Sequence, residues 1–354
     1  MIGALKRAYD SFRGFGDYAF SIPPLDGAFM PNAALDGAPL VLAAHGADNL
    51  TVAGTEAVFS CGPDLMTLDG TVLDRFDGPI TALAGGKDGS IVVAVGDQLI
   101  WRASNGNRHE MPSPCGGADI TALALLSDGA LAVAAGSTEY KAADWQCDLM
   151  ERGQTGAVYL IDAGGNARTL ASGLGFPTGL AEAPDGSLIV SCAWDHLLLR
   201  VTTEGAQSFA LDNLPAYPGR LIRSGGGYWL SFVSIRNQLV EFTLRERPYV
   251  QRMMAEVPRE FWVCPQLRPP QSPMAVMQAG AERHHGEMKP WAPSLSYGLI
   301  VRLDAALQPQ FSLHSRADGD RHGLTSIAAV GDRLLASSHA AGGIIEIPMA
   351  GGTA

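Results

Sequence analysis

Short apolar runs joined by tight turns recur six times along the chain. Each copy has an apolar run, a glycine-containing turn that is often Asp-Gly, and a second apolar run. The six copies span 49–62, 80–95, 120–135, 177–193, 218–234 and 322–339. Glycine tolerates the positive φ that a tight hairpin turn needs, and the flanking Ile, Val and Leu residues suit a pleated strand. The pattern therefore predicts six β-hairpins.

A further apolar run follows each hairpin and is predicted to be a third strand. These runs are 64–70, 98–106, 157–165, 197–205, 238–244 and 344–352. A run of mixed polarity before the next copy supplies a fourth strand. Six repeats of this kind predict an all-β fold, a six-bladed β-propeller around a central channel. The segment 39–45 is expected to close the ring by adding a strand to the last blade.

Two longer segments interrupt the repeat. They cover about 139–156 and 245–296, and each contains a short stretch of helical appearance. Long loops on a compact ring are often lids or binding loops, although some only pack against the rim. We expect both insertions to form caps on a single propeller domain that spans 1–354.

Charge and composition exclude several classes of partner. The 354 residues carry a formal net charge of −11, which disfavours binding to nucleic acid. No apolar run approaches the roughly 20 residues of a membrane span, and no apolar stretch of a secretory signal follows the first residues. The five cysteines form no CxxC pair. Free thiols favour a cytoplasmic protein. We expect its partner to be a small molecule, and the oligomeric state stays open.

Several of these segments resemble one group of known propellers. The segments 173–186, 197–201, 213–232, 297–304 and 322–339 are similar to the strictosidine-synthase-like branch of the six-bladed propellers. That branch is related to the gluconolactonase, senescence-marker and paraoxonase propellers. The resemblance covers roughly residues 45–347 and implies the fold more strongly than the chemistry.

The resemblance implies a calcium ion at the channel mouth, but the ligand residues are incomplete. Asp48 matches one ligand, with Asn49 beside it, whereas Thr178 stands where the family has Asn. Gly219 and Arg220 stand where Asp-Asn is expected. We therefore expect no cofactor and no metal, with calcium near Asp48 as the alternative. Arg220 is instead predicted to bind an anionic group.

The resemblance also implies a catalytic Glu on the inner strand of the last blade. Thr325 occupies that position, and a hydroxyl does not shuttle protons near neutral pH as a carboxylate does. Any catalysis must use other residues. The candidate catalytic residues are Asp48, Glu139, Arg220 and His339. The candidate substrate-binding residues are Asn49, Thr178, Trp194, Tyr217 and Thr325.

Each candidate also has a purely structural interpretation. Asp48 and Asn49 suit an Asx turn, Arg220 suits an ion pair between blades, and His339 suits a hydrogen-bonded strand end. The cluster of His284, His285 and Glu287 is either a metal site or a solvated loop. Aromatic residues of the insertions either roof a pocket or anchor these segments; they are Trp145, Phe261, Trp262 and Trp291.

Three functions stay open at this level. The first is a hydrolase of the lactonase or esterase type that acts on a small organic molecule at the channel mouth. The second is a metal-free, non-catalytic binding protein, or a lyase or condensing enzyme with catalytic residues different from those of strictosidine synthase. The third is a scaffold for another protein, which requires a large exposed apolar patch.

Overall fold

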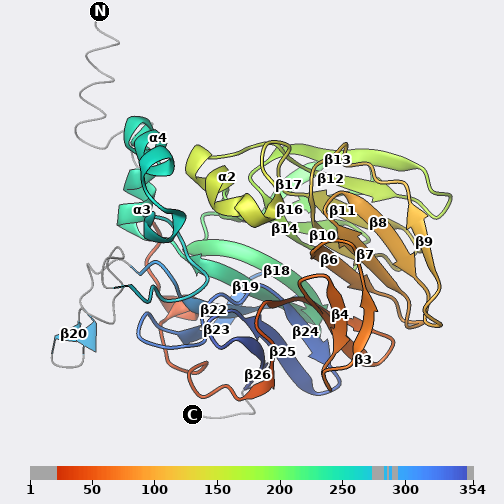
Figure 1. The fold of residues 1–354 in the computed structure, drawn as a ribbon, viewed down its shortest axis with the longest axis horizontal. Coiled ribbons are helices and arrows are strands. Elements are labelled where there is room, and N and C mark those ends of the chain that lie inside the picture. Colours follow the sequence, from red (N-terminus) through yellow and green to blue (C-terminus); the bar gives the residue numbers. More distant parts are fainter. Residues whose placement is uncertain (1–21, 273–282, 285–286, 289–293, 349–354) are drawn as a thin grey trace, which may run out of the picture.

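Six four-stranded antiparallel sheets surround a central channel (Figure 1). The structure is a computed structural model that describes residues 22–272, 283–284, 287–288 and 294–348. Each innermost strand neighbours the innermost strands of the two adjacent blades, and the last of them neighbours the first. The ring is therefore closed, and the predicted six-bladed β-propeller is confirmed.

The strands of each blade follow one another outward from the channel. The innermost strands are β2 (Ala47–Ala53), β6 (Ile80–Gly85), β10 (Ile120–Leu125), β14 (Pro177–Glu182), β18 (Ala216–Ser224) and β24 (Ile327–Val330). The second strands are β3 (Glu56–Cys61), β7 (Ile91–Val95), β11 (Leu131–Ala135), β15 (Leu188–Cys192), β19 (Gly227–Ile235) and β25 (Arg333–Ser338). The third strands are β4 (Asp64–Thr67), β8 (Gln98–Arg102), β12 (Gly156–Ile161), β16 (Leu197–Val201), β22 (Gly298–Leu303) and β26 (Gly343–Ile347). The outermost strands are β5 (Val72–Arg75), β9 (Arg108–Met111), β13 (Ala167–Leu174), β17 (Gln207–Leu211), β23 (Pro309–Ser315) and β1 (Leu40–Ala43).

The hairpin between β14 and β15 shows why the repeat folds in this way. Gly186 has a φ of 80°, which a residue with a Cβ rarely adopts. The Asp185 carboxylate accepts hydrogen bonds from the Ser187 backbone N–H at 3.1 Å and from its hydroxyl at 2.6 Å. The Asp-Gly pair thus supplies both the turn geometry and the bonds that hold it. All six predicted hairpins are present in the structure.

The last blade contains a strand from the beginning of the described chain. β1 pairs with β26, with Leu42 opposite Ile344 and Ala43 opposite Gly343. The backbone N–H of Glu346 also donates to the carbonyl of Pro39 at 3.0 Å. The predicted closure of the ring by 39–45 is therefore confirmed.

One predicted strand is wrong. The segment 238–244 is not the third strand of the fifth blade, because α3 (Gln238–Thr243) is a helix. The Asn237 side chain accepts a hydrogen bond from the Val240 N–H and so caps the first turn. Val240 and Leu244, four residues apart, are buried on one face. The third strand is β22, which follows the long insertion.

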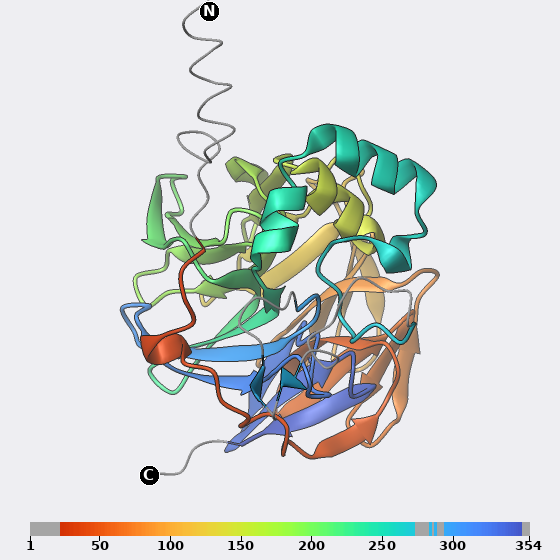
Figure 2. The same cartoon turned by 90° about the vertical axis from the view of Figure 1, so that its left-hand side faces the viewer.

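The helices gather at one end of the channel. Both cartoon views show α2 (Trp145–Glu151), α3 and α4 (Arg247–Glu256) on the same side of the ring (Figure 1 and Figure 2). Both insertions connect a second strand to a third strand, β11 to β12 and β19 to β22. They include short 3₁₀ turns, η3 (Ala142–Asp144) and η4 (Arg259–Phe261), and the strand pair β20 (Arg283–His284) and β21 (Glu287–Met288). A further turn, η2 (Gly27–Phe29), precedes β1.

Within the described part of the chain, no helix is long and apolar enough to cross a membrane.

Candidate functional site

A cavity of about 170 Å³ lies at the helical end of the channel. Its lining residues are Asp48, Thr81, Thr121, Ala142, Trp145, Phe176, Thr178, Trp194, Gly219, Arg220, Val233, Leu267, Thr325 and His339. Residues in or next to the innermost strands contribute one side, while Ala142, Trp145 and Leu267 come from the two insertions. Binding sites for drug-sized ligands are typically about 300–1,000 Å³. This cavity therefore suits a small ligand or the reactive group of a larger one.

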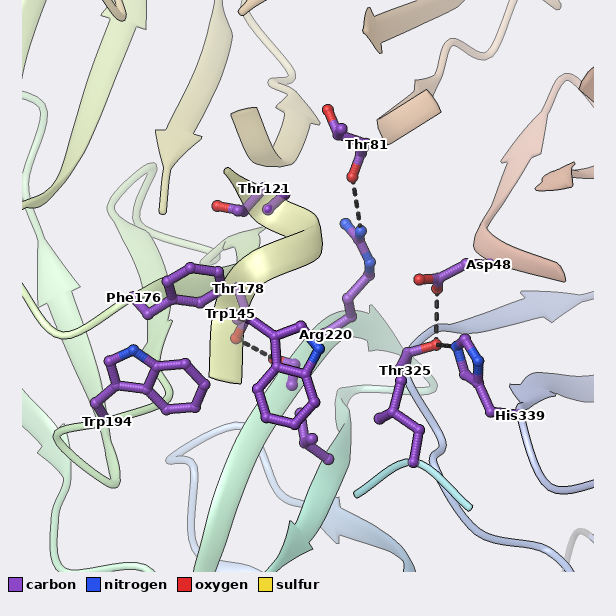
Figure 3. A pocket seen from close by; sticks show the side chains of 14 residues that line it. Asp48, Thr81, Thr121, Trp145, Phe176, Thr178, Trp194, Arg220, Thr325 and His339 are labelled. Carbon is purple, nitrogen blue, oxygen red and sulfur yellow. Dashed lines mark hydrogen bonds between the residues drawn. The ribbon is translucent and has the colours of Figure 1, made fainter. Parts of the chain in front are cut away.

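Three side chains from two blades form a polar row along one wall (Figure 3). The Thr325 hydroxyl donates to Asp48 Oδ1 at 2.8 Å, and His339 Nε2 lies 3.1 Å from the same hydroxyl. Asp48 Oδ1 also accepts the backbone N–H of Asn49 at 2.7 Å. The structure thus brings together three of the residues predicted to be functional.

This row fixes the tautomer of His339. A hydroxyl has a single proton, and Thr325 gives that proton to the Asp48 carboxylate. His339 Nε2 must then carry a proton and donate it to Thr325, which leaves the lone pair on Nδ1. Burial lowers the pKa of His339, although the Asp48 charge opposes this shift. His339 is therefore a neutral imidazole near neutral pH and a candidate base.

Arg220 extends across the channel from β18 toward the first two blades (Figure 3). Its guanidinium donates to Asn49 Oδ1 and, at 3.2 Å, to the carbonyl of Thr81. Burial lowers the pKa of this guanidinium and the Asp48 charge opposes the shift, but an arginine stays protonated in proteins. Both acceptors are uncharged, so the cavity contains a cation that an anionic ligand would stabilise further.

Arg220 also divides the channel. A second volume of about 350 Å³ lies farther along the channel between the innermost strands, and Arg220 is the residue that lines both spaces. The guanidinium thus forms the floor of the helical-end cavity. A ligand that enters from the helical side meets this positive charge at the bottom.

An aromatic wall faces the polar row. Phe176 and Trp194 stack with ring centroids 4.9 Å apart, and Trp145 lies 6.1 Å from Trp194. The Trp194 indole N–H donates to Asp148 Oδ2 on α2 at 2.7 Å, which fixes the ring orientation. Trp145 also belongs to α2, so the first insertion does contribute to the cavity roof. The sequence did not single out Phe176, which has a φ of 50° and lines the cavity.

Several predicted binding residues are used in bonds between blades. Asn49 Nδ2 and the hydroxyls of two threonines donate to carbonyls of the next innermost strand. These bonds join Asn49 to Ile80, Thr121 to Pro177, and Thr178 to Pro218. Asn49 has a φ of 53°, a conformation that asparagine tolerates better than most residues. Asn49 and Thr178 therefore hold the channel mouth in shape whether or not they contact a ligand.

Besides Asn49, two predicted residues lie outside the cavity lining, Glu139 and Tyr217. Glu139 is exposed in the connection after β11, where its backbone N–H donates to Ser137 Oγ. Tyr217 is completely buried, and its hydroxyl donates to Glu241 Oε1 at 3.2 Å. Neither side chain has the position that contact with a ligand in this cavity requires.

The oxygen ligands at the channel mouth do not fit calcium, which takes six to eight of them. Asp48 provides the carboxylate, while the Asn49 amide oxygen is already bonded to Arg220. A guanidinium beside the ion would repel it. Within the described residues, no group of three or more His, Cys, Asp and Glu side chains is arranged to hold a metal.

Other residues singled out in the sequence have no part in the cavity. All five cysteines are free thiols, and burial raises the pKa of Cys115 to about 11 and that of Cys264 to about 12. His285 and Trp291 lie outside the described residues. The side chains of His284 and Glu287 also lie outside the description.

Comparison with known proteins confirms the fold. No protein-family model matches the sequence, and no curated protein matches it either. A calcium-binding regucalcin from Agrobacterium tumefaciens superposes with a TM-score of 0.55 at 14% identity, over 87% of this chain and 91% of that one. A gluconolactonase from Xanthomonas campestris gives 0.53 at 15% identity, over 93% and 96%. A luciferin-regenerating enzyme gives 0.53 at 10% identity, over 88% and 94%.

These similarities agree with the resemblance to gluconolactonase-type propellers inferred from the sequence. Identities this low establish the fold and leave the activity open. The assignment to the strictosidine-synthase-like branch stays a prediction.

Proposed function

We propose that this protein is a metal-independent hydrolase of the lactonase or esterase type. The observation that carries the proposal is the polar row of Asp48, Thr325 and His339, which shares one small cavity with the Arg220 guanidinium. A neutral imidazole can act as the general base for ester hydrolysis, and a fixed cation can stabilise the oxyanion that forms. The fold likeness to a gluconolactonase is a supporting analogy.

The proposed reaction uses water as the nucleophile. His339 Nδ1 takes a proton from the water as it attacks the carbonyl carbon of the substrate. Arg220 stabilises the negative charge that develops on the carbonyl oxygen. His339 then returns the proton to the leaving oxygen, which gives a carboxylic acid and an alcohol. Asp48 acts through Thr325, because its charge stabilises the transient imidazolium.

The aromatic wall determines which substrates fit. Trp145, Phe176 and Trp194 favour a flat apolar group next to the carbonyl. The proposal includes a cytoplasmic location and a small molecule as partner, without nucleic acid or membrane. Thr178 remains a proposed substrate contact, while Glu139 and Tyr217 have no role in this mechanism.

Replacing His339 by Ala is expected to lower kcat by about 10²–10⁴-fold on esters and lactones that bear an aromatic group, because the general base is lost. Arg220→Gln is expected to cost a similar factor through the oxyanion. The measurement is hydrolysis by each purified variant in the presence of EDTA. The controls are His109→Ala on the exposed face of β9 and Arg223→Gln on β18, which should leave kcat unchanged.

Three results would contradict the proposal. Loss of activity in EDTA with recovery in calcium would show that a metal performs the chemistry. Equal kcat values for wild type and His339→Ala would exclude the base. Ligand-dependent thermal stabilisation without turnover across the panel would identify the non-catalytic binding protein instead.

The pH dependence of kcat/KM gives a separate prediction. Burial lowers the pKa of His339 below the ordinary value of 6.5, so the free base persists at lower pH than in an exposed histidine. Activity is expected to stay level from pH 8 to 6.5 and to fall only in more acidic solution. An acidic limb centred above pH 6.5 would show that another group is the base.

A further inference from the structure

A second cavity of about 560 Å³ lies behind the aromatic wall. It is bounded by α2, by α3 and the residues that follow it, and by the turn after β15. Trp194 is the residue that lines both this cavity and the helical-end cavity. Four arginines line it, which is unusual in a chain with a net charge of −11: Arg152, Arg236, Arg245 and Arg247.

Three acidic side chains also line the cavity, Glu151, Asp195 and Glu241, and the last two are bonded to neighbouring groups. Glu241 Oε1 lies 3.1 Å from Arg236 Nε and also accepts the Tyr217 hydroxyl. The Asp195 carboxylate accepts the Gln154 side-chain amide and the Gly175 backbone N–H, both at 2.7 Å. Glu241 therefore offsets the charge of Arg236 and also acts on Arg245.

With Glu151, Asp195 and Glu241 counted against four arginines, the lining has one more cationic than anionic side chain. Arg247 donates to the carbonyl of Met150 at 3.1 Å. In the part of the chain that the structure describes, no carboxylate lies within 4 Å of the Arg152 or Arg247 guanidinium. Burial lowers the pKa of the Arg245 guanidinium, the Glu241 charge opposes this shift, and the charges of Arg152 and Arg236 add to it. Like charges held this close are stabilised when an anion enters between them.

A neutral histidine completes the wall. His196 Nε2 is buried and has no hydrogen-bond partner among the described residues, since Glu241 Oε1 is 3.6 Å away. A buried polar nitrogen without a partner is costly, and a ligand oxygen in the cavity would satisfy it. The volume also lies within the usual range of about 300–1,000 Å³ for small-molecule sites.

We propose that this second cavity binds a small polyanion through Arg152 and Arg247. Guanidinium forks match the oxygens of phosphate and carboxylate groups, so the ligand is a phosphate-bearing or polycarboxylate metabolite. The site is separate from the proposed hydrolase site and does not depend on it. Because Trp194 forms the shared wall and is fixed by Asp148, the anion is placed to act as an effector of the first cavity.

The test is calorimetric titration of the whole protein with inorganic phosphate and, separately, with citrate at low ionic strength. One site per chain is expected for at least one of the two anions, and the anion that binds identifies the ligand class. The double variant Arg152→Gln/Arg247→Gln should weaken that binding at least tenfold. Both side chains are exposed, so the variant should keep the thermal unfolding midpoint of the wild type.

The matched control is Arg252→Gln. Arg252 lies on α4 like Arg247 but outside this cavity, where it pairs with Glu256. Binding to this variant should equal that of the wild type. The proposal is overturned if neither anion binds, if the double variant binds as tightly as wild type, or if Arg252→Gln weakens binding equally.

Discussion

A chain that begins at Ala44 is expected to lose its cooperative unfolding transition, whereas a chain that begins at Ile22 should keep it. The shorter variant lacks β1, so the last blade would have three strands and β26 would be an unpaired edge. The measurement is urea unfolding of both truncated chains beside the full chain, followed by circular dichroism.

The reason for this large effect lies in the contacts of residues 29–43. Leu35 has no exposed surface, and its backbone N–H donates to the carbonyl of His314 at 3.0 Å. The Asn32 side chain donates to the carbonyl of Ser312 at 2.9 Å and accepts the N–H of His314 at 3.0 Å. The segment therefore bonds to β23 of the fifth blade as well as to β26 of the last one.

Energies support the expected loss of folding. Truncating one buried Leu to Ala costs about 2–5 kcal/mol, and a whole domain is usually stable by only about 5–15 kcal/mol. The loss of Leu35 together with the hydrogen bonds between β1 and β26 is therefore expected to remove most of the free energy of unfolding. Leu35→Ala alone should lower the unfolding free energy by about 2–5 kcal/mol without abolishing the transition. A chain starting at Ala44 that unfolds at the wild-type urea concentration would show that closure of the ring by β1 is dispensable.

The hairpins were predictable because their information is local. An Asp-Gly turn between two apolar runs determines φ at the glycine and the burial of the flanking residues, as Asp185 and Gly186 show. The segment 238–244 was misinterpreted because seven residues with alternating apolar positions fit a strand and a helix equally well. Asn237 as a helix cap was the signal that favoured the helix.

The cavity residues fall into two groups, those whose position the sequence repeat predicts and those whose position it does not. Asp48, Arg220 and Thr325 lie at or near the starts of innermost strands, so locating the repeats was sufficient to bring them to one channel mouth. Trp145 and Leu267 reach the cavity from insertions whose course the repeat does not determine. The arginine cavity was missed for this reason, because its residues come from segments that meet through the packing of α2 and α3 against α4.

Stability is expected to fall as the pH is lowered from 7.5 to 5.0, with His314 as a main cause. Burial lowers the pKa of this histidine to about 4. Its ring is buried, with the Tyr297 hydroxyl 3.1 Å from Nδ1 and the Ser312 hydroxyl 2.7 Å from Nε2. The unfolded chain, whose histidine has an ordinary pKa near 6.5, therefore binds a proton that the folded chain excludes.

The sign and size of the stability change follow from the difference between the folded and unfolded pKa of His314. Because the folded pKa is depressed, the contribution is complete above pH 6.5 and is lost as the pH falls toward the folded value. For His314 alone the loss between pH 7.5 and 5.0 is about 2 kcal/mol. Burial also lowers the pKa values of His196, His322 and His339, which adds losses of the same sign.

The measurement compares urea unfolding at the two pH values for wild type and His314→Gln. The variant is expected to be less stable at pH 7.5, since it loses a buried ring, yet its drop between the two pH values should be smaller by about 2 kcal/mol. His109→Gln, which alters an exposed ring stacked on Trp101, should retain the full drop. If His314→Gln shows the same drop as wild type, His314 is protonated equally in both states, and the acid sensitivity must come from the other buried histidines or from carboxylates.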